Sequence, residues 1–204
     1  ARVYDPTGGM VSVNGINIRK IDRDWYRRRF AFVPQDVEIF DGTIRQNIAY
    51  ACPSASNKWV EKAVKAACLD EVVRSPGRFP DGLETQVGER GVRLSGGEKQ
   101  RVGIARAYVA LLSGAVVLVL DEATSSLDSE SERVVQEFIE RLRSEREIII
   151  VAIAHRLSTI QKADVICVLD SGHIIETGDH DQLLRRNGLY KRLVDLQKLG
   201  ELRE

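Results

Sequence analysis

The sequence predicts an α/β fold in which a mostly parallel sheet carries an inserted helical region. Ala115–Leu120 and Ile148–Ile153 are continuous apolar runs of strand length, as expected for buried strands of a parallel sheet. A stretch with helical features separates them, so strand and helix alternate along the chain. A long and mainly helical region, at about residues 36–112, is inserted before this alternation.

The first part of the chain predicts a hairpin, a short helix and a short strand. Asn14-Gly15, between Met10–Val13 and Ile16–Ile18, is a strong hairpin signal. Asp24–Arg29 is typical of a short helix. Ala31–Val33 is typical of a strand, which Pro34 ends.

The inserted region predicts helices and one long loop. Thr43–Ala49 and Lys58–Ala67 carry apolar residues at helical spacing. Residues 76–93 are rich in glycine and proline and predict a long loop, which in a compact domain usually has a function. Gly97–Leu112 predicts a further helix.

The last part of the chain predicts three helices and a second hairpin. Ser129-x-x-Glu132 resembles a capping box that opens a helix to about Arg143. Val165–Leu169 and His173–Glu176 are predicted strands, Asp179 caps a helix, and Leu189–Leu199 is amphipathic. We therefore expect three segments. They are 1–35 and 113–204, which form a core, and 36–112, which forms a helical subdomain.

Composition excludes several classes of protein. Thirty Lys and Arg balance thirty Asp and Glu, whereas a nucleic-acid partner would favour a basic excess. The three cysteines are far apart and form no C-x-x-C pair, which argues against a zinc site or a disulfide framework. No apolar run approaches the roughly 20 residues that cross a membrane.

Two carboxylates, Asp121 and Glu122, follow the apolar run Ala115–Leu120. At the tip of a central strand, one carboxylate can bind Mg²⁺ and its neighbour can orient a nucleophilic water. An acidic cap after a core strand is the alternative explanation.

Ser95-Gly96-Gly97 precede a predicted helix. Backbone N–H groups at a helix N-terminus attract anions. An ordinary serine cap is the simpler alternative.

Five segments resemble, in order, the motifs of ATP-binding cassette (ABC) proteins. They are Val33-Pro34-Gln35 (Q-loop), Leu94-Ser95-Gly96-Gly97-Glu98 (signature), Asp121-Glu122 (Walker B), Ser125-Ser126-Leu127-Asp128 (D-loop) and Ala154-His155-Arg156-Leu157-Ser158 (switch histidine). Residues 85–91 and 40–48 resemble exporters in particular. The resemblance implies a P-loop NTPase (RecA-like) core with an inserted α-helical subdomain. Glu98 replaces the usual glutamine, a variant also found in mitochondrial iron–sulfur and heavy-metal half-transporters.

The resemblance also implies a role for each matching residue, with ATP and Mg²⁺ as cofactors. Asp121 would serve Mg²⁺, Glu122 would be the general base, and Gln35 would sense Mg²⁺ and the γ-phosphate. His155 would contact the γ-phosphate, and Asp128 would communicate across a dimer interface. The signature residues would bind the ATP of a second nucleotide-binding domain; they are Ser95, Gly96, Gly97 and Glu98. The implied location is the cytoplasmic or matrix-like face of a membrane, attached through a transmembrane domain.

The family's phosphate-binding loop, G-x-x-x-x-G-K-[ST], does not occur in these 204 residues. The nearest match runs from Gly91 to Gly96 but continues with Gly97 instead of lysine. We expect the chain to be a piece of a longer protein, with that loop and the first strands upstream. Alone, it should bind ATP very weakly and hydrolyse none, and it should aggregate or be marginally folded. Micromolar ATP affinity, or a cooperative melt of a monomer, would contradict these expectations.

Two alternatives remain open. A non-catalytic module could contribute only its signature motif to the site of a partner. A soluble ABC ATPase of DNA repair or translation is disfavoured by the neutral charge and by the exporter-like residues 88–91. The sequence encoded before Ala1 separates these possibilities.

Overall fold

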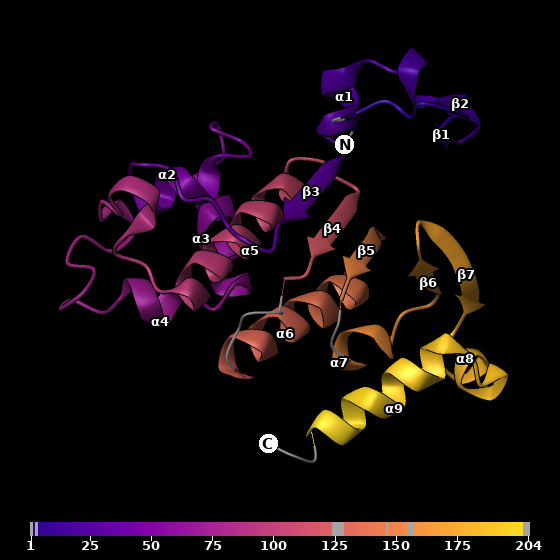
Figure 1. Ribbon diagram of the computed structural model, residues 1–204. Helices are drawn as coiled ribbons and strands as arrows, with labels where there is room; N and C mark the ends of the chain where they lie inside the picture. The colour runs from indigo at the N-terminus through magenta and orange to yellow at the C-terminus, as the bar shows by residue number, and fades with distance from the viewer. Residues whose placement is uncertain (1, 3, 124–128, 146, 155–156, 202–204) are drawn as a thin grey trace. The chain divides into compact units, whose positions relative to one another are not determined.

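The computed structural model describes residues 2, 4–123, 129–145, 147–154 and 157–201. The chain forms two compact units, residues 1–151 and 152–204, and each is described separately. The predicted division at 35/36 and 112/113 concerns subdomains within the first unit and stays a prediction. Figure 1 shows the order of helices and strands along the chain.

The first unit opens with a small hairpin. β1 (Ser12–Val13) and β2 (Ile16–Asn17) pair antiparallel, with Val13 opposite Ile16. Asn14 and Gly15 both have positive φ, as a two-residue turn of this kind requires. The predicted hairpin is therefore confirmed.

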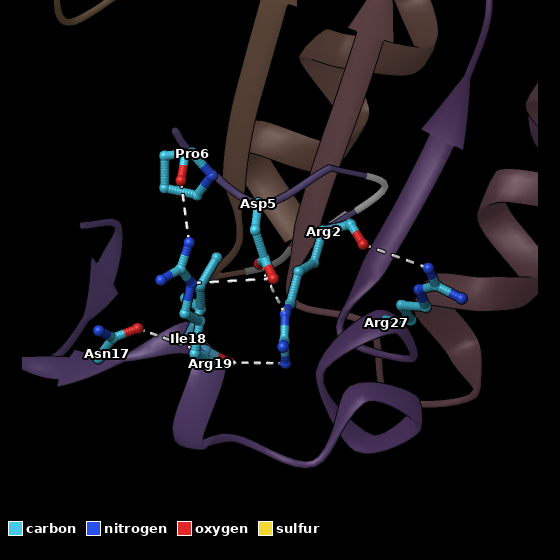
Figure 2. Close-up of polar contacts among 7 residues, drawn as sticks. All are labelled: Arg2, Asp5, Pro6, Asn17, Ile18, Arg19 and Arg27. Carbon is cyan, nitrogen blue, oxygen red and sulfur yellow. Dashed lines mark hydrogen bonds and ion pairs between the residues drawn. The ribbon is translucent and has the colours of Figure 1, made fainter. Parts of the chain in front are cut away.

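Polar contacts join the start of the chain to the 3₁₀ turn Ile18–Lys20, which follows this hairpin, and to the next helix (Figure 2). Arg2 Nε donates to Asp5 Oδ1 at 3.2 Å, and Arg2 Nη1 donates to the carbonyl of Ile18 at 3.1 Å. Arg19 Nη2 donates to the Pro6 carbonyl at 2.9 Å. Asp22 caps the helix α1 (Arg23–Arg27). Arg27 of this helix donates a hydrogen bond to the Arg2 carbonyl, which joins α1 to the start of the chain.

A three-stranded sheet has the order β3 (Phe30–Val33), β4 (Val117–Asp121) and β5 (Ile149–Ile153). β3 and β4 are parallel, with Phe30 opposite Val117 and Val33 opposite Leu120. The chain leaves β3 and returns through β4 in the same direction, and the long helical region lies between them in sequence. The predicted α/β class with a parallel sheet is confirmed.

One face of this sheet is buried and the other is not. Ala31, Val33, Leu118 and Leu120 are at most 2% exposed. On the alternate positions Phe32 is 50% exposed and Ile149 is 63% exposed. The expectation that Ile148–Ile153 is a buried strand was therefore wrong: Ile148 and Ile150 pack on the core, while Ile149, Val151 and Ile153 are exposed. The physical reason is that, among the described residues, helices pack against one face only. An exposed apolar face of this kind favours association with other apolar surface; the expected aggregation of the chain stays a prediction.

The helical region is organised around one long helix. α5 (Gly96–Leu112) packs on β3 and contacts β4. α2 (Ile44–Ala49) and α3 (Asn57–Ala66) pack on α5 (Figure 1). Val60 and Val64 of α3 are buried, as helical spacing predicts. α4 (Asp70–Val73) is a single helical turn that no strong local pattern predicts.

The predicted loop at 76–93 contains two 3₁₀ turns, Gly82–Glu84 and Glu89–Gly91. Gly91 has φ +62°, and an added Cβ would lie 2.8 Å from Ile39 side-chain atoms. Gly103 of α5 lies equally close to Val37, because a Cβ added at Gly103 would lie 2.7 Å from a Val37 methyl group. Two glycines thus allow the segment after Gln35 to lie close against α5 and against the loop.

α6 (Ser129–Glu145) continues the same core. Val134, Val135, Phe138 and Leu142 are at most 2% exposed, which is the stripe that a 3.6-residue period predicts. The Phe138 ring meets Tyr108 of α5 edge to face, with ring centroids 6.0 Å apart.

The second unit contains α7 (Leu157–Ile160), a hairpin and two helices. β6 (Ile166–Asp170) and β7 (His173–Gly178) are antiparallel. α8 (His180–Arg186) carries the predicted Asp179 cap, completed by Gln182. α9 (Leu189–Glu201) begins against the Glu176 carboxylate, which accepts hydrogen bonds from the amides of Leu189 and Tyr190. The buried side chains of this unit are Ile166, Val168, Leu183, Tyr190 and Val194.

Gly91→Ala should destabilise the first unit. A left-handed φ costs an alanine about 1–2 kcal/mol, and displacing Ile39 adds about 1–3 kcal/mol. The matched control is Gly82→Ala, which has φ +55° but only an ordinary 3.6 Å contact with the Val73 carbonyl. Urea unfolding followed by tryptophan fluorescence measures both variants. Equal losses of unfolding free energy would show that the Ile39 contact contributes nothing.

Candidate functional site

Three predicted site residues follow the carboxyl ends of adjacent parallel strands. Gln35 lies two positions after Val33, the last residue of β3. Asp121 ends β4, and Glu122 follows it. Because Val33 pairs with Leu120, both strand ends lie at the same edge of the sheet. In an open parallel sheet this edge is where ligands bind. Gln35 is exposed, and Asp121 and Glu122 are half-buried.

The chain turns sharply at Glu122, which has φ +46°. Left-handed backbone is unfavourable for a residue with a Cβ and often marks a functional position. The next residue is anchored from α5, since Gln100 Nε2 donates to the Ala123 carbonyl at 3.1 Å. Gln100 is 4% exposed and Ala123 is 6% exposed. This buried hydrogen bond fixes the backbone directly after the candidate base.

The predicted signature motif forms the N-terminal turn of α5. Ser95 is the N-cap, and its Oγ accepts a hydrogen bond from the Glu98 amide at 3.3 Å. The serine hydroxyl proton is not used by this bond, so it can be donated to a ligand. Ser95 and Gly96 are exposed, and a Cβ at Gly96 would meet nothing within 4 Å. The turn therefore offers a hydroxyl and free space at the positive end of a 17-residue helix.

Glu98 differs from the other signature residues because it is buried, at 8% exposed. Its carboxylate completes the capping box by accepting from the Ser95 amide at 2.8 Å. It also accepts two hydrogen bonds from Arg78, at 2.6 and 3.0 Å. Burial raises the pKa of Glu98, but the hydrogen bonds from Arg78 and Ser95 outweigh it and leave the pKa below its ordinary value. The carboxylate is thus ionised at neutral pH and fully engaged within the chain.

The residues at the sheet edge fit a magnesium ion in part. Asp121 and Gln35 supply a carboxylate and an amide oxygen, which are hard donors. Mg²⁺ commonly takes one or two protein carboxylates, with water and substrate phosphates in its remaining positions. Within the described ranges no group of three His, Cys, Asp or Glu could hold a metal by itself. The arrangement therefore suits an ion that arrives with a phosphate ligand.

Two predicted site residues, His155 and Asp128, lie outside the described residues. Two further residues were missed by sequence reasoning, namely Arg78 and Gln100. Arg78 lies 20 positions before Glu98 in a loop, so no local spacing connects them. The one signal for Arg78 was Glu98 itself, because a buried acid at this position of the signature needs a cation to balance its charge.

Comparison with known proteins places this geometry in a family. The family model described as ABC transporter matches residues 1–125. A mitochondrial potassium channel ATP-binding subunit from Xenopus tropicalis is 49% identical over 96% of this chain and 28% of its own length. An ATP-dependent lipid A-core flippase from Burkholderia orbicola is 47% identical over 96% of this chain and 32% of its own length. This chain therefore spans less than a third of these curated relatives.

A solved structure shows the same fold. It is a bacterial Atm1-family ABC exporter with ATP bound, which covers 95% of this chain with a TM-score of 0.85 and 42% sequence identity. This chain matches 32% of that chain. The fold and the sheet-edge residues define a nucleotide-binding domain of the P-loop NTPase class. The chain belongs to the ABC transporter family, and its relatives include Atm1-family and mitochondrial members. None of the helices in the described part of the chain is long and apolar enough to cross a membrane.

Gln100→Leu should lower the free energy of unfolding by about 1–3 kcal/mol, because the buried Ala123 carbonyl loses its donor. The control is Gln86→Leu, where the side chain is exposed and a change within about 0.5 kcal/mol is expected. Urea unfolding measures both. A Gln100→Leu variant as stable as the control would contradict the anchoring role of this hydrogen bond.

Proposed function

We propose that this chain is the part of an ABC exporter that binds and hydrolyses ATP to drive transport. The observation that carries the proposal is the pair Asp121-Glu122 at the carboxyl end of β4, with Gln35 at the same edge. The second support is the exposed turn Ser95–Gly97 at the start of α5. Its relatives include proteins named as an ATP-dependent flippase and an ATP-bound exporter.

In this proposal Glu122 is the general base that polarises the attacking water. A carboxylate after a central strand can orient water for in-line attack on a phosphoryl group. The Gln100 hydrogen bond keeps the following peptide in place, so the base is held before substrate arrives. His155, which lies outside the described residues, would contact the γ-phosphate.

Asp121 and Gln35 would hold Mg²⁺ together with the nucleotide phosphates. When bound, the ion neutralises charge that develops on the phosphate oxygens. Gln35 precedes the segment that Gly91 and Gly103 hold close. A change at Gln35 can therefore be passed to the neighbouring helices, which supports its role as a sensor of the γ-phosphate.

The signature turn would serve a second nucleotide-binding domain. Ser95 and Gly96 are exposed, with open space at Gly96, and with Gly97 they begin a helix whose N-terminus suits a phosphate held by another subunit. Asp128 would act across the same interface. We propose a head-to-tail dimer, either homomeric or heteromeric, that shares two ATP molecules.

The transmembrane domain and the membrane are also proposals. The chain would lie on the cytoplasmic or matrix-like face, and the exporter-like residues 85–91 would contact the membrane domain. The transported substrate is not assigned, because the relatives bear names as different as a potassium channel subunit and a lipid flippase.

A second candidate is a non-catalytic module that contributes only its signature turn to a partner. The observation in its favour is that G-x-x-x-x-G-K-[ST] does not occur in this sequence. The two candidates differ in one measurable property. Only a chain that hydrolyses ATP in its own site needs Glu122, so replacing this residue separates the two candidates.

Glu122→Gln in the full-length transporter should lower the rate of ATP hydrolysis by about 10²–10⁴-fold, because a general base contributes that much, while ATP still binds. Phosphate release and equilibrium nucleotide binding measure the two properties. The control is Glu147→Gln, at an exposed glutamate before β5, which should leave the rate unchanged. An unchanged rate in Glu122→Gln would refute the catalytic proposal and favour the non-catalytic module.

A further inference from the structure

The Arg78 guanidinium spans both ends of the signature turn. Its Nη2 donates to the Arg93 carbonyl at 3.4 Å, which lies before the turn. Its Nη1 and Nη2 donate to the two oxygens of the Glu98 carboxylate, which lies after it. The residues enclosed between these contacts are Leu94, Ser95, Gly96 and Gly97. A single side chain therefore ties together the two ends of the turn that faces a ligand.

Arg78 is itself held in place on the loop. The neighbouring Phe79 is 2% exposed and anchors the backbone in the core. The Arg78 guanidinium lies over the Phe79 ring, 5.1 Å from its centroid. Bidentate pairing with a carboxylate adds a fixed geometry that lysine cannot reproduce. The Arg78 side chain is 55% exposed, but the pair has a defined bidentate geometry because the Glu98 carboxylate is buried and Arg78 also lies over Phe79.

The charge of Glu98 creates an electrostatic problem for a site that receives a triphosphate. The carboxylate lies one helical turn from Ser95, at the end of α5 that should attract anions. An unpaired negative charge there would repel the phosphates, and burial would make the repulsion stronger than in water. The paired guanidinium removes this net charge without occupying Ser95 or Gly96.

We infer that Arg78 is a positioning residue for nucleotide binding, which neutralises and holds Glu98 so that the signature turn can accept the phosphates of ATP. The inference rests on the proposed function and assigns a task to a residue that touches no nucleotide. It explains how Glu98 can occupy the signature position at which the family usually has glutamine. In this arrangement Glu98 acts on ATP through the shape and charge of the turn.

A mutant cycle in the full-length transporter tests the inference. The variants are Arg78→Gln, Glu98→Gln, the double variant and Arg78→Lys, with KM for ATP and kcat measured for each. Arg74→Gln is the control, since Arg74 is an exposed arginine just after α4 on the same segment. It should leave KM and kcat unchanged.

Arg78→Gln should raise KM for ATP about tenfold when Glu98 is present, because the unpaired charge repels the phosphates. In the Glu98→Gln background the same replacement should change KM by less than about twofold, because no charge is left to neutralise. Arg78→Lys should fall between wild type and Arg78→Gln, since it keeps the charge but loses the bidentate geometry.

The pH dependence gives a readout that a purely structural role would not produce. In Arg78→Gln the pKa of Glu98 should rise, because burial is no longer opposed by the arginine. Protonation at lower pH then removes the charge, so the KM ratio of Arg78→Gln to wild type should shrink as pH falls. In the Glu98→Gln background this ratio should not depend on pH.

The same KM increase in both backgrounds, or a KM ratio that does not change with pH, would overturn the inference. If Arg78→Gln does not fold, an Arg78→Lys variant with wild-type KM would overturn it equally. Failure of the proposed function gives a different result, in which Glu122→Gln hydrolyses ATP at the normal rate.

Discussion

The contact of α5 with β3 and β4 is the constraint on which the candidate site depends. The first turn of this helix carries the signature residues, and its next turn reaches the chain after Glu122 through Gln100. Because α5 is one continuous helix, the signature turn and the backbone after the candidate base cannot move independently. The same helix closes the core with α2, α3 and α6, so its burial contributes to both stability and geometry.

Close packing extends this constraint to the segment after Gln35. Gly103 and Gly91 leave no space between α5, the loop before it and the side chains of Val37 and Ile39. Packed interiors transmit displacement because they contain few voids. This packing is the route by which, in our proposal, a shift at Gln35 would reach α5.

The acidic residues of the candidate site lie in two places, the sheet edge and the N-terminus of α5. Asp121 and Glu122 lie at the sheet edge, where a cation and a water would be bound. Glu98 lies at the helix terminus, where an anion would be bound, and there its charge is paired with Arg78. The acid at the proposed anion site is thus the one that is paired with an arginine. The sheet also has an exposed apolar face, with Phe32 and Ile149 exposed.

The sequence by itself determined the family and the α/β class, and it predicted Gln35, Asp121, Glu122 and the signature residues as the candidate site. These features are local: periodicity sets a helix or a strand, and contiguous motifs set the chemistry at its end. The predicted hairpins and the Asp179 cap were confirmed for the same reason. Only the tertiary structure decided that Arg78 pairs with Glu98, that Gln100 holds Ala123, and that Ile149 and Val151 are exposed. Those outcomes depend on which distant segments fold against one another, and no short-range pattern records such contacts.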